Sequence, residues 1–376
     1  MLPRADRPEE ACGVFGIYSH EHEVARTTFF GLYALQHRGQ ESAGIATADG
    51  QRIVCHARMG LVAQVFTEHD LRELTGHIAV GHTRYSTTGS SRVCNAQPLL
   101  VDGPAGQIAL AHNGNLVNAP ELRDELERLG YPFDTTTDSE AIAALIVNAE
   151  GETWADRIAS VMPRLVGAYS LAIATGDELI AVRDPLGVRP LCIGKLGSAW
   201  LVSSESCALD TVGGQYIREV DPGEIVTIGP GGVRSQVGQP SHRRASCIFE
   251  FIYFARPDSV IDGRLVYQVR QELGRELARE QPAEADMVVA VPDSAVPAAI
   301  GFSEQAGLPY REALIKSRYI HRTFIQPDQD MRQAGVALKF NPLPEILRDK
   351  RVVVVDDSIV RGTTTGQIVQ MLRRGG

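Results

Sequence analysis

Short apolar runs separated by turn residues dominate the first two thirds of the chain. Residues 44–47 and 53–56 flank Asp49 and Gly50, a pair that favours a tight hairpin turn. A second predicted turn lies between two further apolar runs, residues 170–174 and 179–183. Further strands are predicted at residues 13–19, 77–83 and 107–111. The pattern predicts an α+β domain built mainly from antiparallel hairpins.

Three segments of the same region instead place apolar residues at helical spacing. These helices are predicted at residues 22–35, 118–130 and 139–149. Asn118 and Glu121 predict a capping box at the start of the second helix, with Pro120 in its first turn. Gly130 is predicted to end that helix.

The pattern changes after residues 229–244, which are rich in Gly, Pro, Ser and Arg and predict a linker or an exposed turn. Beyond this segment, continuous apolar strands are predicted at residues 287–291 and 351–355. Helices that alternate with them are predicted at residues 265–278, 295–305 and 365–373. This alternation is typical of a parallel sheet covered on both faces. The chain is therefore predicted to contain two domains of different class.

Composition places the chain among ordinary folded proteins. Its 376 residues are 44% hydrophobic and 22% charged, whereas disordered chains have fewer apolar residues and more charge. The formal net charge of −9 excludes a general attraction to nucleic acid or to an anionic membrane. No apolar run approaches the roughly 18 residues that span a bilayer. The six cysteines include no CxxC pair, which favours reduced thiols in a cytoplasmic protein.

Five residues of the first domain supply the groups that glutamine hydrolysis requires. The Cys12 thiolate can attack a side-chain amide, because sulfur is a strong nucleophile near neutral pH. Asn113 and Gly114 can hold the oxyanion through an amide and a closely approaching backbone N–H. Arg84 can bind the α-carboxylate of the substrate and Asp138 its α-ammonium. Each residue also has a simpler explanation, as a small core residue, a turn or a surface ion pair, so the hypothesis rests on their joint occurrence.

The sequence around these residues resembles a known family. The segments that carry the resemblance are CGVFGI at 12–17, LQHRGQESAGI at 35–45, HTRYST at 82–87 and HNGNL at 112–116. They are similar to the glutamine amidotransferases of the N-terminal nucleophile hydrolase class, which implies a four-layer αββα domain at residues 12–240. The resemblance also implies that residues 1–11 are a propeptide, whose removal frees the α-amine of Cys12 to act as general base. Gly39 and Thr87 match positions near the family's glutamine pocket.

The second domain carries the most specific segment of the chain. The apolar run 352–355 ends in Asp356 and Asp357, and a loop rich in Gly and Thr then enters a predicted helix. Ligands of open α/β sheets bind at the carboxyl ends of strands, and the loop N–H groups and helix N-terminus suit a phosphate. Two adjacent acids suit ribose hydroxyls or a hydrated Mg²⁺. The GxxxxGK(S/T) pattern of a Walker A loop is absent, so a phosphate site of another kind is predicted.

This segment resembles the 5-phosphoribosyl 1-pyrophosphate (PRPP) motif of type I phosphoribosyltransferases, which have an α/β fold with a parallel sheet. The implied PRPP-binding residues are Asp356, Asp357, Ser358, Arg361, Gly362, Thr363 and Thr364. Ser294 follows the other apolar strand, in that family's pyrophosphate loop, and is implied to share a Mg²⁺ site with Asp356 and Asp357. Residues 316–339 match a flexible loop that closes over PRPP, with Arg332 and Lys339 as implied pyrophosphate contacts.

The two halves together resemble the amidophosphoribosyltransferase family, from about Glu10 to Gly376. The implied reaction uses ammonia from glutamine to displace pyrophosphate from PRPP, which gives 5-phosphoribosylamine, the first committed step of purine synthesis. The resemblance also implies feedback inhibition by purine nucleotides and a homotetramer. It places the phosphoribosyltransferase domain at residues 250–376 and implies that this domain is incomplete, because the family continues well past that point.

Two other functions stay open. Glucosamine-6-phosphate synthase and other glutamine amidotransferases share the first domain, but the PRPP motif argues against them. Some transcription regulators bind PRPP without catalysis, and the residues around Cys12 argue against that class.

The resemblance also implies an iron–sulfur cluster, for which this sequence offers one matching ligand. Family members with a propeptide commonly hold a 4Fe–4S cluster through four cysteines, and Cys247 matches the first of them. The other three ligands would lie beyond Gly376. A buried free cysteine explains Cys247 equally well.

Overall fold

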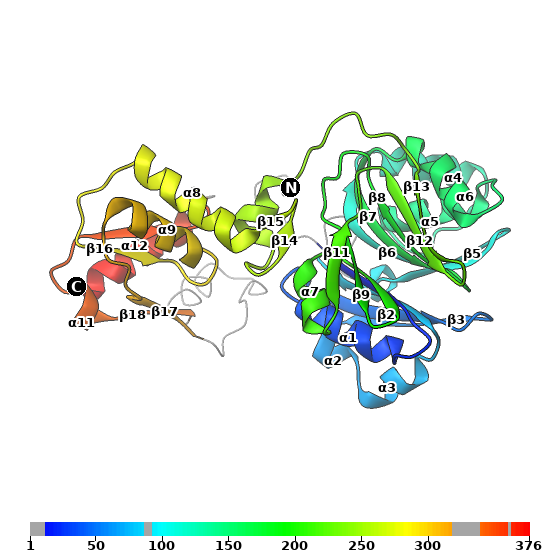
Figure 1. The fold of residues 1–376 in the computed structure, drawn as a ribbon, viewed down its shortest axis with the longest axis horizontal. Coiled ribbons are helices and arrows are strands. Elements are labelled where there is room, and N and C mark those ends of the chain that lie inside the picture. Colours follow the sequence, from blue (N-terminus) through cyan, green and yellow to red (C-terminus); the bar gives the residue numbers. More distant parts are fainter. Residues whose placement is uncertain (1–11, 86–91, 318–338, 360–361) are drawn as a thin grey trace. The chain divides into compact units, whose positions relative to one another are not determined.

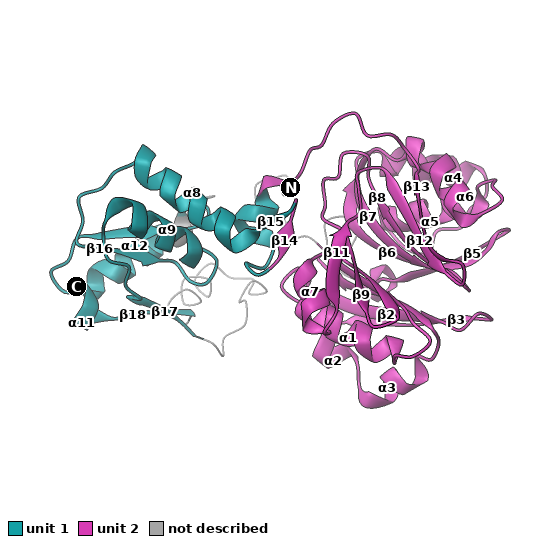
Figure 2. Cartoon of the chain, in the orientation of Figure 1, with its two compact units in different colours: residues 1–8, 249–258, 263–376 teal, residues 9–248, 259–262 magenta. Residues whose placement is uncertain are grey.

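The computed structural model describes residues 12–85, 92–317, 339–359 and 362–376 (Figure 1). These residues form two compact units, coloured separately in Figure 2. Unit 2 contains the described residues up to 248 together with 259–262, and unit 1 contains 249–258 and the described residues from 263 onward. No helix in these ranges is long and apolar enough to cross a membrane.

Unit 2 is built on two antiparallel sheets. Within the described residues, one sheet has seven strands in the order β11-β9-β10-β1-β4-β2-β3, and the other has six in the order β13-β12-β8-β7-β6-β5. The first sheet comprises β1 (Gly13–Tyr18), β2 (Ser42–Ala48), β3 (Ile53–Met59), β4 (Ile78–Arg84), β9 (Cys192–Leu196), β10 (Ala199–Ser203) and β11 (Gln215–Glu219). The second comprises β5 (Leu99–Gly103), β6 (Gly106–Leu116), β7 (Gly167–Ala174), β8 (Leu179–Arg183), β12 (Glu224–Gly229) and β13 (Gly232–Val237). The predicted hairpin around Asp49 and Gly50 is confirmed as β2–β3.

Helices cover the outer face of each sheet (Figure 1). An apolar core fills the space between the sheets. Phe15 and Ile17 of β1 pack on the helix side, whereas Val14 joins the core between the sheets, because side chains alternate along a strand. The first sheet is covered by α1 (Val24–Ala34), α2 (Val62–Val65), α3 (Glu68–Glu73) and α7 (Ser206–Thr211). The second is covered by α4 (Ala119–Arg128), α5 (Asp138–Asn148) and α6 (Trp154–Val161). The unit therefore has four layers, helix–sheet–sheet–helix.

Two local predictions for this unit are confirmed only in part. Asn118 precedes α4, but its side chain makes no capping bond. Its Nδ2 donates to the Arg164 carbonyl at 2.9 Å and its Oδ1 accepts from the Val166 N–H at 3.0 Å, so a tertiary contact has replaced the cap. For the first part of residues 229–244, the exposed-turn alternative is confirmed at the turn of the β12–β13 hairpin, between Gly229 and Gly232, whereas the linker alternative fails because the chain continues as strand β13.

Unit 1 contains a short parallel sheet with helices on both faces. Strands β16 (Met287–Ala290) and β19 (Val352–Val355) pair in parallel. Met287 and Val289 pack with α12 (Thr363–Gly375), and Val288 and Ala290 pack with α9 (Val296–Ala306). The parallel arrangement is thus confirmed for this two-stranded sheet of the described residues. The unit also contains η3 (Glu250–Phe254), β15 (Arg264–Leu265), α8 (Val266–Glu280), β17 (Leu314–Lys316), β18 (Phe340–Pro342) and α11 (Pro344–Leu347).

Helices α8 and α9 touch through their backbones at two glycines. A Cβ atom at Gly274 of α8 would lie 1.8 Å from the Ala298 carbonyl oxygen. A Cβ atom at Gly301 of α9 would lie 2.0 Å from the Gln271 carbonyl oxygen. Both distances are far inside the van der Waals limit of a close-packed interior, so each position requires glycine.

Candidate active sites

The start of β1 and the end of β4 bring the predicted nucleophile and arginine together. These strands are antiparallel, with Gly13 opposite Thr83, so Cys12 lies beside Arg84, the last residue of β4. Cys12 is buried, and its thiol donates to the Tyr85 carbonyl at 3.4 Å. Residues 72 positions apart in the sequence therefore share one end of the sheet.

Three of the predicted glutamine-binding residues, Arg84, Asp138 and Gly39, are buried in the same unit. Arg84 is 2% exposed and Asp138 is 5% exposed, so the interpretation as a surface ion pair is wrong. Asp138 is the first residue of α5, and its Oδ2 accepts from the Leu116 N–H at 2.9 Å. Gly39 lies against the end of β4, where a Cβ atom would be 2.5 Å from the Thr83 carbonyl carbon.

Asn113 and Gly114 lie within β6, which continues through them, so they do not form a turn. His82 Nε2 donates to the His112 carbonyl at 3.0 Å, which joins β4 to β6 one residue before Asn113. Asn113 is fully buried, and neither its Nδ2 nor its Oδ1 has a hydrogen-bond partner among the described residues. Buried amides are almost always paired in folded proteins, so this one is expected to pair with a ligand.

The Cys12 thiol requires a base before it can attack a substrate. Burial raises the pKa of this thiol above its ordinary value, although the hydrogen bond to Tyr85 and the charges of Arg84, Arg189 and Arg38 act in the opposite direction. A neutral thiol is a weak nucleophile. A free α-amine on Cys12, with an ordinary pKa of about 7.7–8.0, would suit the task.

His82, on the same strand as Arg84, is expected to make unit 2 sensitive to acid. Burial lowers its pKa to about 3, whereas the unfolded chain keeps the ordinary value of about 6.5. As the pH falls below about 6.5, only the unfolded state binds a proton here, so the free energy of unfolding falls by about 1.4 kcal/mol per pH unit. His82→Gln keeps a donor for the His112 carbonyl and should reduce this slope by that amount in urea denaturation between about pH 6 and pH 4. Equal slopes for the two proteins would contradict a neutral His82.

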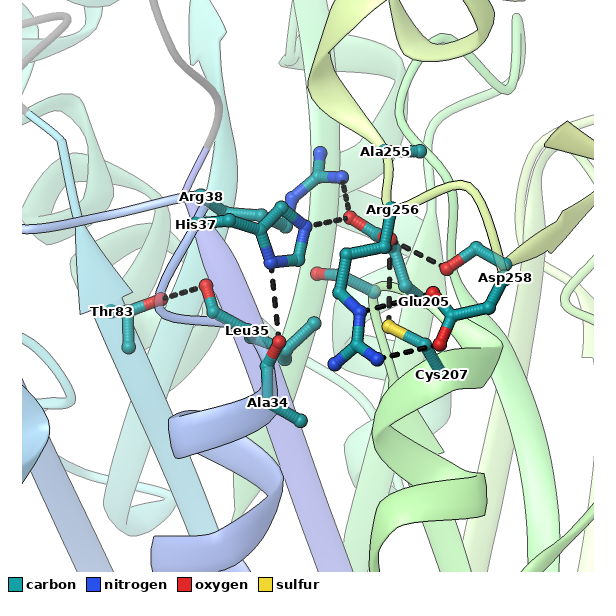
Figure 3. A network of polar contacts seen from close by, with 12 residues as sticks. Ala34, Leu35, His37, Arg38, Thr83, Glu205, Cys207, Ala255, Arg256 and Asp258 are labelled. Atoms are coloured by element: carbon teal, nitrogen blue, oxygen red, sulfur yellow. Dashed lines mark hydrogen bonds and ion pairs between the residues drawn. The ribbon is translucent and has the colours of Figure 1, made fainter. Parts of the chain in front are cut away.

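A buried ionic network, which no sequence pattern revealed, contacts the backbone of Cys12. Figure 3 shows three members of this network, His37, Arg38 and Glu205. Arg38 Nε donates to the Cys12 carbonyl at 2.9 Å, and Arg38 Nη1 donates to Glu205 Oε1 at 2.5 Å. His37 Nε2 lies 2.8 Å from the same carboxylate oxygen, and the Ser259 hydroxyl donates to Oε2 at 2.6 Å. His37 and Arg38 belong to the LQHRGQE segment, but a lone glutamate in a distant segment gives no signal of its own.

The carboxyl ends of β16 and β19 form the second candidate site. The parallel pairing is extended by a hydrogen bond from the Val291 N–H to the Val355 carbonyl at 2.9 Å. The segments that follow the two strands therefore start side by side. Asp356 and Asp357 belong to one segment and Ser294 to the other, just before α9.

The second site gathers negative charge beside a helix N-terminus. Burial, reinforced by the charge of Asp357, raises the pKa of Asp356 to about 6, and the charge of Lys339 acts in the opposite direction. The Ser358 hydroxyl donates to Asp357 Oδ1 at 2.8 Å. Gly362 takes a φ of 70° directly before α12, a conformation that favours glycine. Crowded carboxylates of this kind attract a cation, and the helix start suits a phosphate.

Several predicted residues lie outside the described part of the chain. They are residues 1–11, Thr87, Arg332, Arg361 and most of the 316–339 segment, together with the side chains of Thr363 and Thr364. Their assigned roles stay predictions.

The described residues fit a magnesium site better than an iron–sulfur cluster. They contain no group of three or more His, Cys, Asp or Glu side chains placed to hold a metal ion by themselves. Magnesium needs only one or two carboxylates, because water and substrate phosphates complete its octahedron, and Asp356 and Asp357 supply these. A 4Fe–4S cluster needs four thiolates. Cys247 is a free thiol with no set of cysteines around it in the described ranges, so these residues supply at most one of the four thiolates that the predicted cluster needs.

Comparisons with known proteins show the family to which this chain belongs. A model described as a glutamine amidotransferase domain matches residues 82–211. An amidophosphoribosyltransferase of Synechococcus elongatus is 54% identical over 381 residues, which cover 100% of this chain and 77% of the relative. The chain belongs to the amidophosphoribosyltransferase family. The Methanocaldococcus jannaschii amidophosphoribosyltransferase is 50% identical, over 97% of this chain and 81% of its own length.

A solved structure extends the likeness to the fold. It is described as the glutamine PRPP amidotransferase of B. subtilis complexed with ADP and GMP, and it is 48% identical. The superposition has a TM-score of 0.90 and covers 97% of this chain and 79% of that one. The predicted activity is thereby confirmed: this amidophosphoribosyltransferase is a glutamine PRPP amidotransferase of purine biosynthesis. The two alternative functions are excluded.

Proposed function

We propose that glutamine is hydrolysed at Cys12 in unit 2 and that the ammonia attacks PRPP at the strand ends of unit 1. The observation that carries the first step is the fully buried amide of Asn113, on the strand joined to β4, which has no hydrogen-bond partner among the residues that the structure describes. The Cys12 thiol gives its proton to the free α-amine as its sulfur bonds to the amide carbon, and the carbonyl electron pair moves onto oxygen to form the oxyanion. The carbon–nitrogen bond then breaks as the α-ammonium returns the proton to the nitrogen, and ammonia leaves. Asn113 and the Gly114 N–H stabilise the oxyanion, and water then hydrolyses the thioester to glutamate.

Glutamine is held for this step by the residues that surround the end of β4. Arg84 binds its α-carboxylate through two parallel hydrogen bonds, and Asp138 binds its α-ammonium. Their burial supports these roles, because charged groups out of water bind an opposite charge strongly. Gly39 and Thr87 complete the proposed pocket.

Removal of residues 1–11 is proposed to activate Cys12. A nitrogen in a peptide bond cannot accept the thiol proton, whereas a free α-amine can. Intact-mass measurement of active enzyme is expected to show a chain that begins at Cys12. Full activity in protein that retains these residues would refute the proposal.

Residues 250–376 are proposed to form a phosphoribosyltransferase domain of type I. Ammonia attacks C1 of PRPP, the bond from C1 to the pyrophosphate oxygen breaks, and the new amine loses a proton. The proposed PRPP ligands are Asp356, Asp357, Ser358, Arg361, Gly362, Thr363, Thr364, Arg332 and Lys339. Mg²⁺ held by Ser294, Asp356 and Asp357 would neutralise charge on the departing pyrophosphate.

Regulation and assembly are proposed from the relatives. The B. subtilis enzyme is described as complexed with ADP and GMP, which supports feedback inhibition of this enzyme by purine nucleotides. A homotetramer and a cytoplasmic location are proposed from family membership alone. The 4Fe–4S cluster stays a prediction that rests on Cys247, and iron analysis of the purified protein tests it.

Pyrophosphate release tests the proposed reaction as a whole. We expect release that requires glutamine or ammonia, PRPP and Mg²⁺ together, with glutamate formed only from glutamine. Glutamate formation without any PRPP-dependent pyrophosphate would contradict the role of unit 1. Pyrophosphate release with ammonia but never with glutamine would contradict the role of Cys12.

A further inference from the structure

The backbone carbonyl of the nucleophile is held by a side chain. Strand β1 begins at Gly13, one residue after Cys12. The Cys12 carbonyl accepts a hydrogen bond from Arg38 Nε at 2.9 Å. If Cys12 becomes the first residue, this carbonyl is the first backbone acceptor through which the protein can orient its amine and thiol.

Arg38 is in turn fixed by Glu205. Arg38 Nη1 donates to Glu205 Oε1 at 2.5 Å, and neither side chain is exposed to solvent. The guanidinium is planar, so anchoring Nη1 also sets the direction of the Nε–H. His37 and Ser259 hold the two oxygens of the carboxylate (Figure 3 shows His37, Arg38 and Glu205).

Glu205 carries its negative charge despite its position. Burial opposes ionisation, but the charges of His37 and Arg38 and the hydrogen bonds from His37 and Ser259 lower its pKa well below the ordinary value. The network therefore pairs a buried cation with a buried anion, and removal of the anion would leave Arg38 without its counter-charge.

We propose that Glu205 is a positioning residue for glutamine hydrolysis, which acts through Arg38 on the orientation of Cys12. This inference rests on the proposed role of Cys12 as nucleophile. The simpler interpretation is an ion pair that only stabilises the fold. The two differ in their effects, because a stabilising pair has no reason to change the turnover of the glutamine step in protein that remains folded.

Glu205→Gln is the direct test, since it keeps the size of the side chain and an oxygen that can accept from Arg38. The kcat of glutamine hydrolysis should fall about 10- to 100-fold, because a small misplacement of a reacting group lowers the rate by about this factor. KM for glutamine should change little, because Arg84 and Asp138 are untouched. Alkylation of Cys12 by iodoacetamide, followed by peptide mass spectrometry, should slow with kcat, and ammonia-dependent activity should persist.

Two further variants separate positioning from stability. Glu224→Gln is the control, because Glu224 is also a buried carboxylate of unit 2 that pairs with an arginine, at 2.6 Å from the partly exposed Arg218. It should lower stability and leave the kcat of glutamine hydrolysis unchanged. Arg38→Lys keeps a positive charge opposite Glu205 but loses the Nε donor, so its kcat should fall like that of Glu205→Gln.

The outcomes are distinct. Wild-type kcat in Glu205→Gln or in Arg38→Lys would overturn the proposal, and so would an equal loss in Glu224→Gln. If Glu205→Gln does not fold, Arg38→Lys decides alone. Glutamine hydrolysis that survives in Cys12→Ala would refute the proposed function itself, whereas loss in Cys12→Ala with wild-type Glu205→Gln would refute only the positioning role.

Discussion

Cys12→Ala is expected to abolish phosphoribosylamine formation from glutamine while it preserves formation from free ammonia. The thiol supplies the bond that releases ammonia from the amide, and loss of a covalent nucleophile lowers kcat by roughly 10⁴-fold or more. Attack of ammonia on PRPP involves no group of unit 2 in the proposed reaction. Pyrophosphate release, assayed with each nitrogen source in turn, measures both effects.

Cys55→Ala is the control for this experiment. Cys55 is a half-buried thiol on β3, and burial raises its pKa to about 12, so it is not expected to react. Both activities should survive its replacement. An equal loss of both activities in Cys12→Ala would contradict two separate sites.

Asp357→Asn is expected to abolish phosphoribosylamine formation from both nitrogen sources. The neutral amide removes one of the two charges proposed to hold Mg²⁺, and loss of an electrostatic contact to a developing charge typically costs about 10²- to 10³-fold in kcat. Both nitrogen sources share the PRPP site, so they should fall together. Asp356→Asn should act in the same direction, and removal of Mg²⁺ with a chelator should mimic both variants.

Asp286→Asn provides the comparison for this site. Asp286 precedes β16, at the opposite end of the strand from Ser294, and accepts from the Arg351 N–H at 2.8 Å. An amide oxygen can take over that bond, so activity should persist. If Asp357→Asn lowered the glutamine-dependent activity but spared the ammonia-dependent activity, the assignment of Asp357 to the PRPP site would be contradicted.

Local chemistry made much of this fold predictable. The Asp49-Gly50 hairpin, the strands of the β7–β8 hairpin and the apolar strands β16 and β19 all follow from short-range patterns. The family segments led to Cys12, and the register of β1 against β4 then placed it beside Arg84. Strand pairing is a long-range property. The sequence therefore predicted which residues form the site, but not which strands pair to bring them together.

The remaining features depend on tertiary contacts that no local pattern encodes. Asn118 has the spacing of a helix cap, but its amide makes its hydrogen bonds with the backbone of Arg164 and Val166 instead. Asn113 looked like part of a turn until β6 proved continuous. Glu205 is one glutamate among many in the sequence, and only the fold places it against Arg38.

The glycine contact between α8 and α9 limits how the PRPP site can adapt. With no room for a Cβ atom at Gly274 or Gly301, sliding by one residue would drive a neighbouring side chain into the facing backbone. Ser294 lies two residues before α9, so its loop is tied to this locked pair. We therefore expect the loop before α9 to keep its position when ligands bind. Accommodation of substrate, product or a bulkier analogue must then come from the opposite side, beyond β19.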